Sequence, residues 1–307
     1  MNIRDMIIKL TEEGVGAKRI AARLGITEWR VRTERNAYNN KLIKGKSLSS
    51  GGIATFSSNK VKTSKRAATR AVVLSDIHIP YQDTAALSVA LAFMKNYKPD
   101  NIVLNGDIID FYPVSSFSKD PLRIDTLQDE VDDVISFLRQ LKEDHPKAGI
   151  DYVKGNHEDR LERFLTNKAP ALSSLNCLSI DELLDLGTYG ISFYDESVYL
   201  GELEVTHGYL VRKNPGASAK AVHEKTAKSI LIGHVHRLNK SYMRNKYGQH
   251  LLIENGCLSS LEPDYTRFPN WQHGFTTVEY DSSGELSTTL HHIEDGVLLE
   301  STVSYSG

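Results

Sequence analysis

Acidic, imidazole and amide side chains recur in five short blocks of the sequence, each following directly on an apolar stretch. The blocks are Asp76-Ile-His78, Gly106-Asp107-Ile-Ile-Asp110, Gly155-Asn156-His157-Glu158, His207-Gly208 and Gly233-His234-Val-His236. Such a mixture of ligands favours Mn²⁺, Fe or Zn²⁺ over Ca²⁺. Two such cations about 3.5–4 Å apart would share a bridging carboxylate, clamp a phosphate group and activate a water molecule. The blocks therefore predict a metal site suited to phosphate chemistry.

The elements that must position these side chains are short strands alternating with amphipathic helices. Strands are predicted at Ala71–Ser75, Asn101–Leu104, Ile150–Lys154, Leu203–Thr206 and Ser229–Ile232, and helices at Thr84–Tyr97 and Asp125–Glu143. This alternation is typical of an α/β fold, in which sites gather at the carboxyl ends of the strands. Residues i and i+2 leaving a strand point to the same side, so Asp76 with His78, and His234 with His236, can face one cluster.

The last third of the chain has the pattern of β-hairpins rather than of helices. Strands are predicted at Lys240–Tyr247, Gln249–Glu254, Phe275–Tyr280 and Glu285–Ile293. The acidic stretch Asp129–Asp133 is expected to be the solvated face of a helix. The aromatic loop that carries Tyr265 and Trp271 could form a substrate rim, although packing in the core is the simpler expectation.

The five blocks, in this order over roughly residues 71–240, resemble the motifs of the calcineurin-like metallophosphoesterase superfamily. The resemblance implies an α/β fold of the four-layer α/β/β/α type, with a dinuclear metal site, for a catalytic domain at residues 71–307. It also implies two divalent metal ions, with Mn²⁺ expected first and Fe or Zn²⁺ as alternatives.

The resemblance also implies a role for each residue of the blocks. One metal would be held by Asp76, His78, Asp107 and His236, and the second by Asn156, His207 and His234 together with Asp107, which would bridge the two. His157 would be the histidine that is not a ligand, contacts the phosphate and protonates the leaving oxygen. Asp110 matches the acidic residue that orients this histidine.

Two branches of the superfamily do not fit the sequence. Protein Ser/Thr phosphatases continue the second motif with Arg-Gly, where this chain has Phe111-Tyr112, and they lack the paired Gly-His-x-His. Purple acid phosphatases have a metal-binding tyrosine at the position of Asp110. The remaining group contains DNA nucleases, cyclic nucleotide diesterases and small phosphatases.

Charge is distributed unevenly along the chain. Residues 1–70 contain 16 Lys and Arg against 5 Asp and Glu, a net charge of +11, whereas the remaining residues carry −13. Residues 1–43 have the apolar spacing of short helices and predict a helix-turn-helix, in which Gly25 forms the turn, Thr27 caps the next helix and Val31 points inward. Residues 44–70 predict a flexible basic linker.

The basic amino-terminal segment suggests a polyanion as partner. If the helix-turn-helix binds duplex DNA, Arg30, Arg32 and Arg35 are the expected contacts. A helical hairpin can equally bind protein or pack on the catalytic domain, and those alternatives stay open. The sequence does not indicate an oligomeric state.

A cytoplasmic protein without a membrane segment is expected. No apolar run approaches the roughly 18 residues of a membrane-spanning helix, and the start of the chain lacks the pattern of a secretory signal. The two cysteines, Cys177 and Cys257, cannot form a disulfide framework.

These observations together predict a dinuclear metal-dependent phosphoesterase in which a metal-bridging hydroxide attacks phosphorus. The first expectation for the substrate is DNA, cleaved by a phosphodiesterase or nuclease that the amino-terminal module brings to it. The alternatives are a phosphomonoesterase acting on nucleotides or phosphoproteins, and a DNA-binding regulator whose phosphoesterase domain is inactive.

Overall fold

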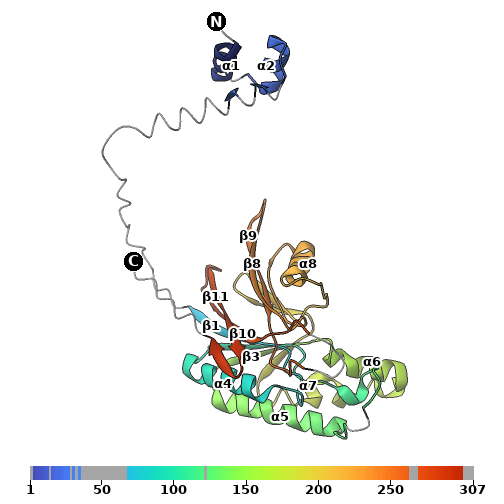
Figure 1. Cartoon of the computed structure of the whole chain (residues 1–307). Helices are drawn as coiled ribbons and strands as arrows, with labels where there is room; N and C mark the ends of the chain where they lie inside the picture. The colour runs from blue at the N-terminus through green and yellow to red at the C-terminus, as the bar shows by residue number, and fades with distance from the viewer. Residues whose placement is uncertain are drawn as a thin grey trace. The chain divides into compact units, whose positions relative to one another are not determined.

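The computed structural model describes residues 3–13, 15–27, 30–31, 34–35, 68–120, 123–262 and 269–299. The chain divides into two compact units, Met1–Ser64 and Lys65–Gly307 (Figure 1). None of the described helices is both long and apolar enough to cross a membrane.

The larger unit is built on two β-sheets. The seven-stranded sheet has the order β12-β11-β10-β1-β2-β3-β4 and the five-stranded sheet the order β5-β6-β7-β9-β8. The bounds are β1 Thr69–Leu74, β2 Asn101–Asn105, β3 Gly149–Val153, β4 Ile191–Tyr194, β5 Ser197–Leu200, β6 Leu203–Thr206, β7 Ser229–Ile232, β8 Leu238–Asn245, β9 Gly248–Asn255, β10 His273–Tyr280, β11 Leu286–Glu294 and β12 Val297–Leu299. Strands β1 to β4 are parallel, as are β6, β7 and β9.

The two sheets pack face to face through a core of small and branched apolar side chains. Val73 and Val103 contribute to this core from the first sheet, and Val205, Leu231 and Ile253 from the second. Successive side chains along a strand point to opposite faces of the sheet, so every second residue of β1 enters this inner core while its neighbours face the helices. The strong burial of β1, β2 and β7 on both sides explains their continuous apolar sequences.

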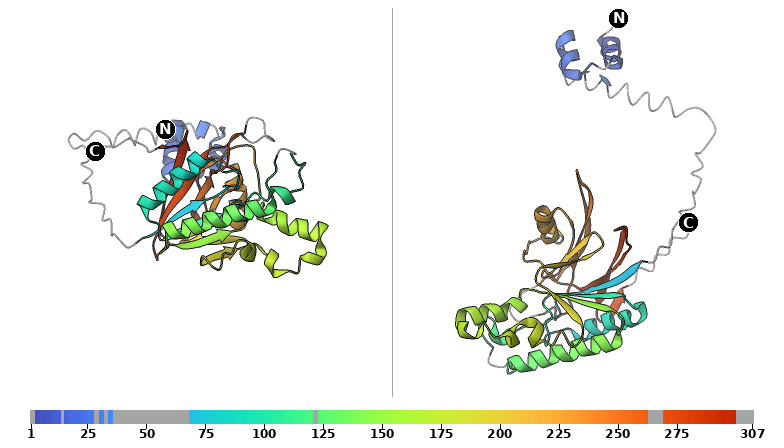
Figure 2. Two further views of the ribbon diagram at one scale, coloured as in Figure 1. Left: turned by 90° about the horizontal axis from the view of Figure 1, so that it is seen from below. Right: turned by 180° about the vertical axis from the view of Figure 1, so that it is seen from behind.

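Helices cover the outer faces of both sheets (Figures 1 and 2). The helices α4 (Thr84–Tyr97), α5 (Leu127–Asp144), α6 (Glu158–Lys168) and α7 (Ile180–Leu183) belong to the core on the outer face of the first sheet. Helix α8 (Ala217–Thr226) packs on β7 and β9 of the second. The order of layers is helix, sheet, sheet, helix, which confirms the predicted sandwich.

Helix α5 begins with a capping box. The Thr126 hydroxyl accepts from the backbone N–H of Asp129 at 3.2 Å, and the Asp129 carboxylate accepts from the N–H of Thr126 at 2.8 Å. The expectation of a fully solvated acidic face at Asp129–Asp133 was wrong at one position, because Glu130 is 1% exposed. Its place in the helix turns it toward the chain that follows β2.

Helix α8 was not predicted because its sequence lacks a strong apolar period. Helix α8 buries Ser218, Ala219, Val222 and His223, which give little hydrophobic signal.

The predicted strands of the last third form two antiparallel hairpins, β8 with β9 and β10 with β11. The two hairpins join different sheets, β10 lying antiparallel to β1 and β9 parallel to β7.

The smaller unit contains α1 (Ile3–Glu12) and α2 (Ala17–Leu24), which pack around Ile7, Ile20 and Val31. Gly25 ends α2 in the left-handed region, and the Thr27 hydroxyl accepts from the N–H of Arg30 at 3.3 Å. Of the expected DNA contacts, Arg30 is exposed, Arg35 is half-buried and Arg32 lies outside the described residues. Most of the predicted linker at residues 44–70 also lies outside them.

The end of that linker belongs to the larger unit. Strand β1 begins at Thr69, and the Arg70 guanidinium donates to the carbonyls of Tyr97 at 2.8 Å and Lys98 at 2.7 Å. Arg70 therefore packs on the end of α4.

Candidate active site

The structure brings all nine predicted catalytic and ligand residues together at the carboxyl ends of parallel strands from both sheets. They follow β1 (Asp76, His78), β2 (Asp107, Asp110), β3 (Asn156, His157), β6 (His207) and β7 (His234, His236). Since the five strands end at the same side of the sandwich, residues up to 160 positions apart in sequence share one site.

The backbone of the site is unusual in its conformation. Asp76, His78, Asp107, His234 and His236 all have positive φ, between 53° and 66°. This left-handed region is uncommon for residues with a side chain and is found where a functional site over-determines the backbone. Here it makes the chain turn sharply as it leaves each strand, so that residues two apart both face the site.

The first group of donor atoms comes from the ends of β1 and β7. His236 Nε2 lies 3.1 Å from Asp76 Oδ1 and 3.2 Å from His78 Nε2. Asp76, His78 and His236 are buried and close enough together to hold one cation. The Asp76 carboxylate is fixed from its other side, because the N–H of His234 donates to both of its oxygens at 2.9 and 3.0 Å.

Asp107 lies at the centre of the cluster. Its Oδ2 is 3.2 Å from His207 Nε2, 3.7 Å from His157 Nε2 and 3.8 Å from His78 Nε2. Asp107, His207 and His234 form a second group able to hold a cation, and Asn156 Oδ1 lies 3.2 Å from His207 Nε2. His78, Asp107 and His157 form a third such group, so Asp107 belongs to two groups and His157 also lies within reach of a cation.

The donor set fits divalent cations. His207 Nδ1 is 2.9 Å from the carbonyl of Asn105, so it carries the hydrogen and leaves a lone pair on Nε2. That lone pair faces the oxygens of Asp107 and Asn156, which are also acceptors. Three acceptors that face one another need a positive charge between them, and a metal ion or a proton provides it.

The pKa shifts of the histidines in the cluster run in opposite directions, according to the charges beside each buried ring. Burial alone would lower the pKa of His207, but the charge of Asp107 and the hydrogen bond to it raise that pKa to about 10. Burial likewise opposes ionisation of Asp107, and the nearby charges of His157 and His207 outweigh it and hold its pKa well below the usual range. At His78, burial and the charge of His157 lower the pKa to about 4.

Asp110 holds two histidines at once. Its Oδ1 lies 3.0 Å from His157 Nδ1 and 3.1 Å from His78 Nδ1. Burial raises the pKa of this carboxyl, but the hydrogen bonds from the two histidines lower it further than burial raises it. His157 Nε2 faces the site at 3.7 Å from Asp107 Oδ2, nearly the same distance as that of His78 Nε2, which is 3.8 Å. The distances alone therefore do not separate a ligand from a proton donor at His157.

Glu158 is a structural residue of the site that the sequence analysis did not single out. Its fully buried carboxylate accepts from the N–H groups of Asp107 and Ile108 at 2.9 Å, from that of Gly155 at 2.8 Å and from the Tyr152 hydroxyl at 2.7 Å. These bonds tie the chain after β2 to the chain after β3. Its place within the Gly-Asn-His-Glu block was the available signal.

Arg160 was also missed. Its guanidinium donates to the carbonyl of Asp110 at 2.8 Å and to the Asp110 carboxylate at 3.2 Å, and its second terminal nitrogen lies 2.8 Å from His157 Nε2. Arg160 stands three residues after His157 on α6, a spacing that places two side chains on the same face of a helix. That spacing could have predicted the contact.

The aromatic loop before β10 reaches the site through Trp271. The rings of Trp271 and His236 are 4.3 Å apart, and the N–H of Gln272 donates to the carbonyl of His236 at 2.8 Å. The half-buried indole therefore packs on a candidate ligand. Tyr265, the other aromatic residue named for this loop, lies outside the described residues.

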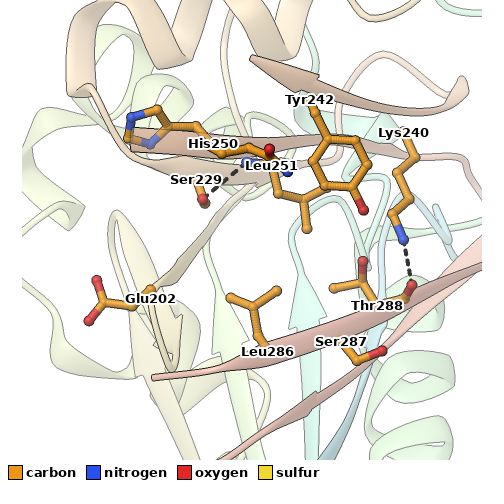
Figure 3. A pocket seen from close by; sticks show the side chains of 10 residues that line it. Glu202, Ser229, Lys240, Tyr242, His250, Leu251, Leu286, Ser287 and Thr288 are labelled. Carbon is orange, nitrogen blue, oxygen red and sulfur yellow. Dashed lines mark hydrogen bonds between the residues drawn. The ribbon is translucent and has the colours of Figure 1, made fainter. Parts of the chain in front are cut away.

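A separate pocket of about 340 Å³ lies between β8, β9 and β11 (Figure 3). Ser229, which lines it, is the first residue of β7, so the pocket is at the opposite end of that strand from His234 and His236. The Lys240 ammonium donates to the carbonyl of Thr288, and the Ser229 hydroxyl accepts from the N–H of Leu251. These polar groups already bind one another, and the pocket shares no residue with the metal cluster.

A two-sheet sandwich that gathers buried carboxylates and imidazoles at one edge in this way defines a metal-dependent hydrolase of phosphoric esters. The sequence model of the family described as calcineurin-like phosphoesterase matches residues 69–257, and the chain belongs to that family. The superfamily and the fold predicted from the five sequence blocks are thereby confirmed.

Phage proteins are among the relatives of this chain. The Gene 54 protein of Mycobacterium phage D29 is 28% identical over 242 residues, which span 70% of this chain and 90% of that protein. The Gene 54 protein of Mycobacterium phage L5 is 27% identical over 228 residues, which span 69% and 89%. Neither name states an activity.

Among solved structures, vacuolar protein sorting 29 from Cryptosporidium parvum matches 76% of this chain and 95% of its own, with 16% identity and a TM-score of 0.43. The purple acid phosphatase PPD1 from yellow lupin matches 77% of this chain and 53% of its own, with 12% identity and a TM-score of 0.43.

Proposed function

We propose that this enzyme is a phosphodiesterase that acts on DNA. The cluster of carboxylate and imidazole donors supports hydrolysis of a phosphate ester, but it does not by itself select a diester. The observation that carries the choice of DNA is the net charge of +11 on residues 1–70, joined to a catalytic unit that is acidic. A basic segment tethered to a phosphoesterase raises the local concentration of a polyanionic substrate.

Two divalent cations would be held by residues already in place. Asp76, His78, Asp107 and His236 would bind one cation, and Asp107, Asn156, His207 and His234 the other. Bound there, the cations would act as Lewis acids on the phosphoryl group and supply a nucleophile at neutral pH. The mixed donor set favours Mn²⁺, with Fe or Zn²⁺ as alternatives.

His157 is the proposed general acid. Asp110 accepts from its Nδ1 and so fixes the ring, leaving Nε2 directed at the site. Protonated His157 would donate from Nε2 to the leaving oxygen, and the Asp110 carboxylate would stabilise the charged ring. In this structure the Arg160 guanidinium lies on the same nitrogen. Access of the leaving group to Nε2 therefore requires the guanidinium to move aside.

The test compares esters under identical conditions with Mn²⁺. Hydrolysis of bis-p-nitrophenyl phosphate much faster than of p-nitrophenyl phosphate, together with cleavage of DNA, supports the proposal. The reverse order of rates would establish a phosphomonoesterase. Binding of DNA without turnover of any ester would establish a regulator with an inactive catalytic domain.

A further inference from the structure

The chain between Asp110 and α5 carries a concentration of aromatic and basic side chains that the proposed chemistry does not use. Residues 111–126 include the short 3-10 helix η1 (Tyr112–Val114), and only residues 121–122 of this segment are not described. We define the cation–aromatic face by six residues that this segment brings together with its neighbours: Tyr81, Tyr112, Phe117, Lys119, Arg123 and Arg160.

Cations and rings alternate across this face. The Arg123 guanidinium carbon lies 4.5 Å from the ring centre of Tyr81 and 4.7 Å from that of Tyr112. Lys119 Nζ lies 4.6 Å from the Tyr112 ring, and the Arg160 guanidinium carbon lies 5.8 Å from the Phe117 ring. Each distance is within the range of cation–π attraction. The Tyr81 and Tyr112 rings are half-buried around Arg123 and form the base of the face.

The face begins at the catalytic pair. The Arg160 guanidinium lies near the Phe117 ring and also binds Asp110 and lies beside His157 Nε2. Because His157 is the proposed donor to the leaving oxygen, the group attached to that oxygen would lie near Arg160, which stands beside Phe117. The face is therefore on the leaving-group side of the scissile bond.

Phe117 is the part of the face that is open to a ligand. Its side chain is 70% exposed. Ile124, on the same segment, is 85% exposed. An exposed ring beside an arginine offers stacking for a planar group and positive charge for a phosphate in one place.

We propose that the cation–aromatic face binds an unpaired DNA strand on the leaving-group side of the scissile phosphate, with a base stacked on Phe117 and Arg160 beside the adjoining phosphate. Single-stranded nucleic acid is bound by alternating rings and cations because every base has a π-face that a duplex would keep stacked. The proposal rests on the DNA phosphodiesterase function and names the form of DNA that the site accepts.

The test compares two strands of equal length that differ only in their bases. One is oligothymidylate, and the other carries abasic sugars at every position, so both present the same phosphates. Wild-type enzyme should cleave oligothymidylate with the higher kcat/KM. Phe117→Ala should lower kcat/KM on oligothymidylate about 5- to 100-fold, the effect of losing one stacked base, and should lower it far less on the abasic strand. Phe117→Trp should keep the preference for bases.

Tyr247 provides a matched control. It is 74% exposed, has Lys246 Nζ 4.7 Å from its ring and lies in the turn between β8 and β9, away from the face. Tyr247→Ala should leave both rates unchanged. Equal losses on the two strands for Phe117→Ala, or no loss on either, would overturn the stacking role alone. Failure of the wild-type enzyme to cleave either strand would overturn the DNA phosphodiesterase function as well.

Discussion

Single residues of this site have contacts that divide their roles. Asp107 belongs to two of the three groups of described residues that could hold a cation, whereas Asp110 belongs to none of them and instead orients His78 and His157. The two carboxylates stand only three residues apart, yet Asp110 faces the Nδ1 atoms of His78 and His157 whereas Asp107 faces their Nε2 atoms. A substitution at each position should therefore have a different signature.

His157→Asn should slow the chemical step while leaving the metals bound. Loss of a general acid costs about 10²–10⁴-fold in kcat. Asparagine keeps a polar group near Asp110 but has no proton of suitable acidity to give. The rate on a chromogenic diester should be measured together with metal content by elemental analysis. Metal content that falls with the rate would show that His157 is a ligand.

The residues that gather at the candidate site could be predicted from the sequence because their types and spacing are local to each strand end. Glu158 and Arg160 could not be assigned in the same way, since their partners, Asp107 and Asp110, come from another strand's loop. A single sequence shows which residue types are available. It does not show which backbone N–H groups a buried carboxylate will accept from.

At the scale of elements, the same limit applies to sheet membership. Local patterns predicted the β8–β9 and β10–β11 hairpins, but nothing local to them specifies that one joins β7 and the other β1. Helix α8 escaped prediction since Ser218 and Ala219 are small. Their smallness suits close packing on the second sheet, which is a property of the assembled fold.

The chains that follow β2 and β3 lie so close together that one methyl group added at Gly155 should have a strong effect. A Cβ at Gly155 would lie 2.3 Å from Asp107 Oδ1 and 2.4 Å from the Asp107 nitrogen. Gly155→Ala should therefore displace Asp107, reduce bound metal below two ions per chain and lower kcat at least about tenfold, on the scale of losses from disturbed metal-site support.

Gly187 is the control for that substitution, since a Cβ there would meet nothing within 4 Å. Gly187→Ala should keep full metal content and activity. Normal metal binding by Gly155→Ala would mean that the chains after β2 and β3 can separate without cost to the site.

Helix α5 carries a buried carboxyl that should make stability depend on pH. Burial and the negative charge of Asp110 raise the pKa of Glu130 to about 8. The folded state then holds a proton that the unfolded state releases above its ordinary pKa, so stability falls as pH rises from about 4.5 to 8. Glu130→Gln should remove this fall and raise the melting temperature relative to wild type at pH 8.

Melting curves of wild type and Glu130→Gln between pH 4.5 and 8 measure this difference. Asp133→Asn is the control, because Asp133 is an exposed carboxylate on the same helix. The assignment of a neutral Glu130 fails if Glu130→Gln melts below wild type by the same margin at every pH.

At the scale of the whole molecule, the charges of the two units have opposite signs, and the candidate active site lies in one unit whereas the predicted helix-turn-helix contacts with DNA lie in the other. Every residue of the metal cluster belongs to the unit Lys65–Gly307, so removal of residues 1–64 should spare hydrolysis of a small chromogenic ester. The truncation must stop short of β1, since Thr69 and Arg70 are part of the first sheet.

The strength of DNA binding by the amino-terminal unit, and its dependence on salt, should reflect the exposed basic side chains of that unit. Arg30 is exposed at the start of the helix that Thr27 caps, and Lys9 is exposed on α1 of the same unit. If the predicted helix-turn-helix places the second helix against DNA, Arg30→Glu should weaken binding about tenfold and reduce the salt slope by about 1, the effect of losing a phosphate contact. Lys9→Glu makes the same change of charge on a different helix and should weaken DNA binding less. Fluorescence anisotropy over a salt series separates the outcomes: equal losses for the two variants indicate attraction by net charge alone, and no loss for either removes DNA binding from this unit.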